Sequence, residues 1–205
     1  MTVPRLLYSL LLYLAAPLLL LRLLWRGRRQ RGYLRHIPER FGFYADAGRH
    51  RYLWLHAVSV GETRAVEPLV RALQAQYPQH RILLTHMTPT GRETGIGPFG
   101  DSVTRCYLPY DYPGATRRFL EHFRPEAGLL IETEVWPNLI AAAVSGGIPL
   151  HLINARLSER SLRGYRKVGA LAYDALRGFS LIAAQTEADA TRLLALKATR
   201  VVVTG

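Results

Sequence analysis

The chain has 205 residues, of which 27 are Lys or Arg and 15 are Asp or Glu, giving a formal net charge of +12. Its single cysteine, Cys106, excludes an internal disulfide and agrees with a reducing compartment. Because Cys106 lies in an apolar strand pattern, we interpret it as a small core residue and not as a nucleophile.

Residues 1–25 have the composition of a membrane anchor. The run from Leu6 to Leu21 is almost wholly apolar, and about 20 apolar residues are needed to cross a bilayer core. Pro17 and Arg22 weaken a straight transmembrane helix. A cleaved secretory signal carries its positive charge before the apolar run, whereas here the charge follows it. We therefore expect an uncleaved membrane-anchor helix that either spans the bilayer or lies in its interface.

A basic arm, residues 26–50, follows the apolar segment. Residues 1–42 contain 8 arginines and one glutamate, so they hold more than half of the net positive charge. An arginine excess after an apolar segment predicts that the following side is cytoplasmic. We expect the arm to meet anionic lipid head groups or an anionic lipid substrate. A nucleic-acid partner is disfavoured because no DNA- or RNA-binding motif is present.

Residues 51–205 alternate strand-like and helix-like segments joined by short Gly, Pro and Asp connectors. This alternation predicts right-handed βαβ units in one domain, and hence an α/β fold: a Rossmann-like parallel sheet with helices on both faces. The Gly-, Thr- and Pro-rich stretch 90–101 is expected to be a mobile loop. The expected strands are 52–58, 82–88, 103–108, 127–132, 149–154, 181–184 and 200–202, and the expected helices are 63–77, 113–123, 135–145, 162–176 and 187–196.

The first expected strand ends at a Ser/Gly turn that carries a glutamate. Ser59 and Gly61 lie in the turn, and Glu62 falls in the first turn of the following helix. Backbone N–H groups at a helix start favour negative charge, so the Glu62 carboxylate should stay ionised, as a general base must. A lone glutamate here is more often only a favourable helix start, so the assignment depends on a second acidic turn at the same edge.

That second acidic turn follows the expected strand 127–132. Glu132 and Glu134 lie between this apolar strand and a helix whose first turn holds Pro137. The strand has no structural need for two carboxylates at its exit, although acidic residues are also favoured in a helix first turn. The carboxyl ends of parallel strands share one edge, where open α/β folds bind ligands. We therefore interpret Glu62, Glu132 and Glu134 as one candidate active site.

A polar glycine turn follows the second expected strand. Thr88, Thr90 and Gly91 could hold a phosphate or a hydroxyl of an acceptor, although turns of this kind are usually only turns. Neither a P-loop nor a Gly-x-Gly-x-x-Gly pattern accompanies them. The sequence therefore predicts at most an acceptor subsite at this turn.

Asn154 and Arg156 follow the fifth expected strand, and so should lie on the same edge as the glutamates. A guanidinium group binds carboxylate or phosphate through paired hydrogen bonds. Arg156 could therefore clamp an anionic group of a ligand, or could merely pair with Glu134 or Glu159.

No metal site is expected. Histidines in buried strands are more often hydrogen-bonded core residues than metal ligands, and those of this chain are too far apart in the sequence to suggest a ligand set. They are His56, His86 and His151. At the other end, 201–205 form a strand that stops on a turn glycine, from which we expect the sequence to be the first half of a longer protein.

These motifs together resemble the 3-deoxy-D-manno-octulosonic acid (Kdo) transferases, which add Kdo to lipid A precursors. The resemblance extends over almost the whole chain and begins with the apolar N-terminal segment. The other matching segments are Arg40-Phe41-Gly42-Phe43-Tyr44, His56-Ala57-Val58-Ser59-Val60-Gly61-Glu62, Met87-Thr88-Pro89-Thr90-Gly91, Tyr107-Leu108-Pro109-Tyr110-Asp111, Glu132-Thr133-Glu134-Val135-Trp136-Pro137-Asn138-Leu139, Asn154-Ala155-Arg156-Leu157-Ser158, Ala183-Ala184-Gln185 and Val203-Thr204-Gly205.

The resemblance implies the N-terminal, acceptor-binding domain of a two-domain GT-B glycosyltransferase at the cytoplasmic face of the inner membrane. It implies that Glu62 is the catalytic base and that Glu132 helps to stabilise the transition state. The donor substrate CMP-Kdo would be bound mainly by a C-terminal domain, the acceptor would be lipid IVA, and no cofactor is expected. Acceptor-binding roles would fall to Ser59, Gly61, Thr88, Thr90, Gly91, Glu134, Asn154 and Arg156.

Two other functions stay open from the sequence. The chain could be a non-catalytic, membrane-bound lipid-binding module, or part of another GT-B transferase with a different lipid acceptor. Without its second half, it is expected to be inactive as a transferase.

Overall fold

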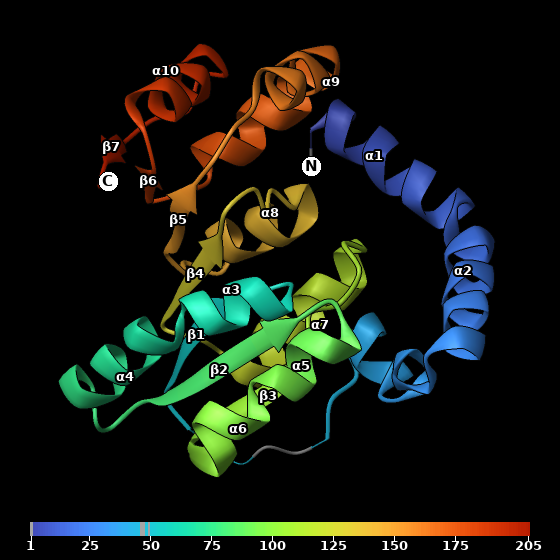
Figure 1. Ribbon diagram of the computed structural model, residues 1–205. Helices are drawn as coiled ribbons and strands as arrows, with labels where there is room; N and C mark the ends of the chain where they lie inside the picture. The colour runs from blue at the N-terminus through green and yellow to red at the C-terminus, as the bar shows by residue number, and fades with distance from the viewer. Residues whose placement is uncertain (1, 46–47, 49) are drawn as a thin grey trace.

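The computed structural model, which describes residues 2–45, 48 and 50–205, has a seven-stranded parallel sheet at its centre (Figure 1). All seven expected strands are confirmed, with ends that differ by at most two residues. The strands are β1 (Tyr52–His56), β2 (Arg81–His86), β3 (Val103–Tyr107), β4 (Ala127–Ile131), β5 (Leu150–Ala155), β6 (Leu181–Ala184) and β7 (Val201–Val203).

The strand order is β3-β2-β1-β4-β5-β6-β7. The central strand β1 pairs with β2 on one side, where Leu53 lies beside Ile82, and with β4 on the other, where Leu53 lies beside Ala127. Successive strands are therefore added in one direction from β1 to β3, and in the opposite direction from β4 onward. The gap between the exits of β1 and β4 is the point at which the direction of winding changes.

Helices cover both faces of the sheet, as expected. Val70 and Phe99 pack on one face, and Phe119, Leu139 and Leu176 pack on the other. The helices of the first face include α4 (Glu67–Gln76) and α6 (Ile96–Phe99), and those of the second are α7 (Pro113–Phe123), α8 (Pro137–Ser145), α9 (Glu159–Arg177) and α10 (Glu187–Ala195).

Trp54 is fully buried in the middle of β1. Its indole packs edge-on against the Phe119 ring at 5.0 Å between centroids. On the neighbouring strand Gly128 lies in register with Trp54, and Leu150 lies in register with Gly128 from the other side. A side chain at residue 128 would meet Trp54 and Leu150, each 2.6 Å from the position of its Cβ.

Replacing Gly128 by alanine should therefore lower the free energy of unfolding, by about 1–3 kcal/mol, because the extra methyl group overpacks the core. Denaturant unfolding followed by tryptophan fluorescence measures this change. Gly164→Ala is the matched control, since nothing lies within 4 Å of its Cβ position on α9 and its free energy of unfolding should stay equal or rise. Equal stabilities of the two variants would show that the interior around Trp54 is looser than described.

The expected single helix over 63–77 is wrong. The chain forms α3 (Val60–Ala65), which begins earlier than expected, and then α4, with a break at Val66. Pro68 explains the break, because its ring lacks an N–H and collides with the carbonyl four residues earlier in a continuous helix. Pro68 occupies the first turn of α4, where neither effect matters.

The expected mobile loop 90–101 is also wrong. It contains α5 (Pro89–Thr94), α6 and the short 3-10 helix η3 (Gly100–Ser102). Thr88 caps α5 by accepting a hydrogen bond from the Gly91 N–H at 3.1 Å, and Pro89 stands at the first helical position. Thr88 and Pro89, which directly precede the expected loop, therefore begin a helix that continues into it.

The expected single membrane-anchor helix is wrong as well. Residues 3–29 form two helices, α1 (Val3–Leu14) and α2 (Ala16–Arg29), bent by 50° at their junction. Pro17 lies in the first turn of α2, and this accounts for the bend. Among the helices of the described residues, none alone is long and apolar enough to cross a membrane. Taken together, the bent pair α1 and α2 has the length and the composition that a membrane span requires.

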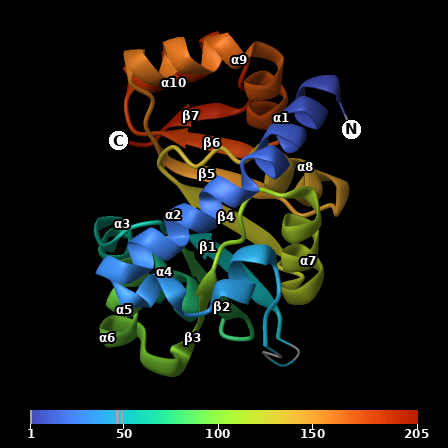
Figure 2. The same cartoon turned by 90° about the vertical axis from the view of Figure 1, so that its right-hand side faces the viewer.

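The two N-terminal helices pack against the domain at the end of the sheet where the strands exit (Figures 1 and 2). Ser9 of α1 hydrogen-bonds to Asn138 in the first turn of α8 at 3.0 Å. The Tyr112 hydroxyl donates to the carbonyl of Leu12 at 3.1 Å, and the rings of Tyr13 and Tyr112 lie 5.0 Å apart. The apolar segment is thus attached beside the carboxyl edge of the sheet, defined here as the edge at which the seven parallel strands end.

Candidate active site

The two acidic turns meet at the point where the winding of the sheet changes direction. Glu62 follows β1, whereas Glu132 and Glu134 follow β4, and these strands are hydrogen-bonded neighbours. In open α/β sheets this crevice, outside the carboxyl ends of the strands, is where ligands bind. The expectation that the three glutamates share one edge is confirmed by the strand order.

Glu62 is held by the turn that precedes α3. Its two carboxylate oxygens accept hydrogen bonds from the Val58 N–H at 2.7 Å and from the Ser59 hydroxyl at 2.9 Å, and Ser59 also caps α3. Burial raises the pKa of Glu62, the two hydrogen bonds oppose the rise, and the charges of Glu132 and Glu134 add to it. The charges of Glu132 and Glu134 therefore act on the Glu62 carboxylate.

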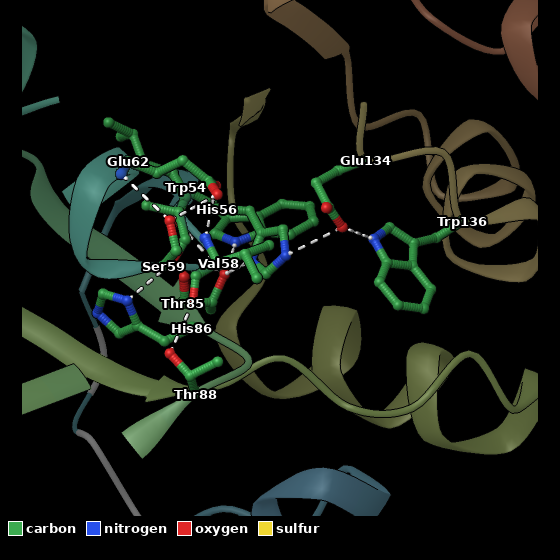
Figure 3. A network of polar contacts seen from close by, with 12 residues as sticks. Trp54, His56, Val58, Ser59, Glu62, Thr85, His86, Thr88, Glu134 and Trp136 are labelled. Atoms are coloured by element: carbon green, nitrogen blue, oxygen red, sulfur yellow. Dashed lines mark hydrogen bonds and ion pairs between the residues drawn. The ribbon is translucent and has the colours of Figure 1, made fainter. Parts of the chain in front are cut away.

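The polar turn after β2 packs directly on the Glu62 turn. Thr88 donates a hydrogen bond to the Val58 carbonyl at 3.0 Å (Figure 3). Gly91 is buried so tightly there that a Cβ would lie 2.9 Å from the same carbonyl. Thr90 and Gly61 are exposed at the surface of the two turns. The turn after β2 and the turn after β1 are therefore in contact. The Thr90 side chain and the Gly61 backbone are exposed at the carboxyl edge of the sheet.

Glu132 leaves β4 in a left-handed backbone conformation, with φ = 64°. Asn154, near the end of the neighbouring strand β5, has the same conformation, with φ = 50°. This conformation costs most residues about 1 kcal/mol or more, and non-glycine residues hold it mainly where the surroundings impose it. The Glu132 N–H donates to the Ile153 carbonyl at 3.0 Å, so the two turns are fixed to each other.

Glu134 accepts a hydrogen bond from one side chain and faces a second side chain from a different element (Figure 3). The Trp136 indole Nε1 donates a hydrogen bond to Glu134 Oε2 at 2.7 Å. The same oxygen lies 3.7 Å from His56 Nε2, at the end of β1. The helix expected from 135 begins at Pro137, so both Glu134 and Trp136 belong to the turn that precedes α8.

This arrangement belongs to a known family. Residues 35–205 match the profile of a family described as 3-deoxy-D-manno-octulosonic-acid transferase (kdotransferase). The chain is 45% identical over 208 aligned residues to a 3-deoxy-D-manno-octulosonic acid transferase of Bordetella pertussis, covering 97% of the chain. The chain is a member of the Kdo transferase family. It spans about half the length of such relatives, namely 48% of the Bordetella protein and 45% of one from Haemophilus influenzae that is 40% identical.

Solved structures support the same fold at much lower identity. The chain resembles the UDP-GlcNAc 2-epimerase of Neisseria meningitidis with a TM-score of 0.53 and 19% identity, over 76% of this chain and 46% of that one. A second UDP-N-acetylglucosamine 2-epimerase gives a TM-score of 0.56 at 14% identity, over 77% of this chain and 48% of that one. At such identities the likeness shows the parallel α/β fold alone.

Asn154 and Arg156 do lie on the carboxyl edge of the sheet, and both are exposed. The alternative that Arg156 pairs with Glu134 or Glu159 is wrong. Glu134 is engaged by Trp136, and Glu159 pairs with Arg192 at 2.6 Å. Arg156 is exposed at the same edge. Burial there acts to raise the pKa of Asp189, but the hydrogen bonds from Leu157 and Thr186, then the charge of Arg192 and last that of Arg156, lower it.

The expectation of three satisfied core histidines is only partly right. His56 and His86 are fully buried, whereas His151 is half-buried. His86 Nδ1 lies 2.8 Å from the Ala57 carbonyl, and burial lowers the pKa of His86 to about 3, so a neutral ring donates from Nδ1. In both buried rings Nε2 lacks a hydrogen-bond partner among the described residues.

Two buried charged residues near the edge were not singled out from the sequence. The Arg40 guanidinium lies 3.9 Å from the centroid of the Tyr107 ring and donates to the Met87 carbonyl at 3.2 Å, which attaches the basic arm beside the Thr88 turn. Asp111 accepts hydrogen bonds from the N–H groups of Asn138 and Leu139, and burial raises its pKa to about 7. The sequence signal that could have identified Arg40 and Asp111 is their place in the Arg-Phe-Gly and Pro-Tyr-Asp motifs.

Across the residues that the structure describes, no group of three or more His, Cys, Asp and Glu side chains could hold a metal ion. Cys106 is buried, and burial raises the pKa of its thiol, as expected for a core residue and not for a nucleophile.

Proposed function

We propose that the chain is the N-terminal, acceptor-binding half of a GT-B glycosyltransferase that transfers Kdo from CMP-Kdo to lipid IVA in lipopolysaccharide biosynthesis. The observation that supports this most directly is the position of Glu62. Its carboxylate lies with Glu132 and Glu134 at the ligand-binding edge of the sheet, in a chain whose relatives are named Kdo transferases.

In the proposed reaction Glu62 is the general base. A carboxylate has about four lone-pair positions, of which the Val58 N–H and the Ser59 hydroxyl use two. A free lone pair accepts the proton of an acceptor sugar hydroxyl as its oxygen attacks the anomeric carbon of Kdo. The bond to CMP breaks as the new glycosidic bond forms, and the configuration at the anomeric carbon inverts.

The neighbouring residues would hold the reacting groups in place. The Glu132 carboxylate would stabilise positive charge that develops on the Kdo ring. The exposed Arg156 and Asn154, together with the Ser59, Gly61, Thr88, Thr90 and Gly91 turns, would contact the phosphorylated sugar of the acceptor. The donor nucleotide would be bound mainly by a second domain, across a cleft from this edge, without a cofactor.

The N-terminal helices would place this edge at the cytoplasmic face of the inner membrane. Residues 3–25 carry twelve large hydrophobic side chains that are each at least 43% exposed, a larger apolar surface than soluble proteins ordinarily leave in water. Arginines follow them directly on α2, and Arg29 stacks on Trp25 at 4.6 Å. An apolar surface beside basic side chains favours a membrane that contains anionic lipids.

Replacing Leu14, Leu18 and Leu21 together by glutamate should weaken binding to anionic vesicles by about 100-fold or more. These side chains are 62–68% exposed, so the change leaves the interior intact. If each leucine contributes only about 1 kcal/mol of burial, three together account for two orders of magnitude. Vesicle sedimentation measures the effect.

A matched control introduces three glutamates elsewhere, at Tyr77, Val168 and Leu194, which are 41–56% exposed. It makes the same change in charge and should bind vesicles almost normally. Equal losses in both variants would mean that net charge, and not the N-terminal apolar surface, decides membrane binding.

The proposed reaction is tested with the full-length transferase that contains these residues. The purified protein is incubated with CMP-Kdo and lipid IVA, and the lipid is analysed by mass spectrometry. A product heavier by one or more Kdo residues is expected. Lipid binding without any product would favour a non-catalytic lipid-binding module, and transfer to a different lipid alone would favour another GT-B transferase.

A further inference from the structure

His56 is the last residue of β1 and is completely buried. Its Nδ1 lies 2.9 Å from the Thr85 hydroxyl and 3.2 Å from the Thr85 carbonyl. Its Nε2 makes no hydrogen bond within the part of the chain that the structure describes, and lies 3.7 Å from Glu134 Oε2. A buried polar atom left without a partner costs about 1–3 kcal/mol, so this orientation requires an explanation.

The hydrogen bonds around Thr85 decide which ring nitrogen carries the hydrogen. Trp54 Nε1 donates to Thr85 Oγ1 at 2.8 Å, so the hydroxyl has one proton of its own to give. His56 Nδ1 lies nearer to that hydroxyl, at 2.9 Å, than the Leu55 carbonyl does, at 3.3 Å. With the proton directed to Nδ1, the ring hydrogen is on Nε2, which faces Glu134.

Two N–H groups therefore converge on one oxygen of Glu134 (Figure 3). Trp136 Nε1 binds Oε2 at 2.7 Å, and His56 Nε2 faces the same atom at 3.7 Å. Within the described residues Glu134 Oε1 accepts no hydrogen bond, and the side chain is 20% exposed. The carboxylate is thus held through one oxygen, while the other receives no hydrogen bond from the described residues.

We propose that His56 is a positioning residue, which with Trp136 holds Oε2 of Glu134 so that Oε1 accepts a hydrogen bond from a hydroxyl of the carbohydrate acceptor. This inference rests on the proposed function of the site. It assigns a purpose to a histidine that is inaccessible to any ligand. The recognised group is an uncharged hydrogen-bond donor, because an anionic phosphate would be repelled by the three glutamates.

The test is a double-mutant cycle of His56→Phe and Glu134→Gln in the full-length transferase. Phenylalanine keeps the ring shape and removes the N–H, and glutamine turns its amide group toward the acceptor. Each change should raise the KM for lipid IVA about tenfold, with the KM for CMP-Kdo unchanged. The double variant should be no worse than Glu134→Gln alone, because both changes act through the same carboxylate.

Two further variants separate positioning from folding. His56→Gln restores an N–H donor close to the place of Nε2 and should recover part of the acceptor KM. Trp136→Phe removes the second donor from a half-buried side chain and should raise the acceptor KM even if His56→Phe does not fold. Thermal unfolding of every variant checks that a rise in KM is not a loss of folded protein.

Multiplicative effects of His56→Phe and Glu134→Gln on the acceptor KM would overturn the inference, as would an effect on the donor KM alone. The same cycle is measured as the Kd for lipid IVA without donor. If the wild-type protein binds lipid IVA but transfers no Kdo, the proposed reaction is refuted. The role of His56 is then decided by the double-mutant cycle of Kd values for lipid IVA. A wild-type protein that binds no lipid IVA would overturn both.

Discussion

Replacing Glu62 by glutamine should lower the rate of Kdo transfer to lipid IVA by about two to four orders of magnitude, the usual contribution of a positioned general base. Glutamine has the size of glutamate, and its carbonyl oxygen can still accept the Val58 N–H, while its amide can face the Ser59 hydroxyl. The turn before α3 should therefore keep its shape. The amide cannot take a proton from the acceptor hydroxyl, so the loss should appear in kcat.

Glu67→Gln is the matched control for this change. Glu67 lies in the first turn of the next helix, where it pairs with Arg71 at 2.7 Å on the surface. Losing such a surface pair costs at most about 1 kcal/mol of stability, and transfer should be unaffected. If Glu62→Gln keeps its activity within about threefold of the wild type, Glu62 is not the base.

The pH dependence of transfer gives a second measure of the same residue. A general base must be ionised, so transfer is lost as the pH falls through its pKa. Burial, followed by the charges of Glu132 and Glu134, raises the pKa of Glu62 above the ordinary glutamate value of 4.5. The acidic limb of kcat/KM should therefore lie above pH 4.5, and it should disappear from the residual activity of Glu62→Gln.

The sheet and its acidic edge could be predicted from the sequence because both depend on local pattern. Seven apolar runs separated by helical patterns imply parallel strands, and parallel strands end at one edge. Glu62, Glu132 and Glu134 therefore had to share that edge in almost any strand order. The sequence could not supply the strand order itself, which makes β1 and β4 neighbours and lets the charges of Glu132 and Glu134 raise the pKa of Glu62 in addition to burial.

The role of the histidines could not be predicted for the same reason. His56 follows a run of apolar residues in β1, and this apolar pattern predicts that it is a core residue. The structure confirms that His56 is buried. Its contact with Glu134 depends on the turn that follows β4, including the left-handed Glu132. Such a contact joins residues 78 positions apart through side-chain orientation, and no local pattern encodes it.

The misplaced helices had a different physical cause. The stretch 90–101, which follows Pro89, was interpreted as a loop, and Pro68 was passed over inside one expected helix, but both prolines stand in the first turn of a helix. At Pro17 the same rule divides the N-terminal segment into two helices instead of one. The bend lets the apolar surface follow the domain beside the carboxyl edge.

The 205-residue chain by itself should bind lipid IVA but give no detectable Kdo transfer. It covers about half the length of its relatives, and its carboxylates line only one edge of one sheet. In the proposed two-domain enzyme the donor is held across the cleft. Positioning two reactants is worth about 7–11 kcal/mol of the barrier, so one wall of the cleft can hold an acceptor without supporting its reaction.

The binding half of this prediction depends on charge. The basic arm and Arg156 present exposed guanidinium groups, and exposed charges more than about 10 Å apart are screened in 0.1 M salt. Lipid binding should therefore weaken as salt is raised, whereas the contribution of the exposed leucines on α1 and α2 should persist. Vesicles with and without lipid IVA distinguish recognition of the acceptor from general adhesion to the membrane.

The catalytic half is tested by incubating the purified chain with CMP-Kdo and lipid IVA and searching for product by mass spectrometry. The full-length transferase, assayed in parallel, shows that the substrates are competent. Turnover by the 205-residue chain would place the donor site within these residues, and the two-domain proposal would have to be given up. If turnover appears only when a separately purified second half is added, the donor site lies in that second half. The 205-residue chain would then supply the acceptor-binding side of the cleft.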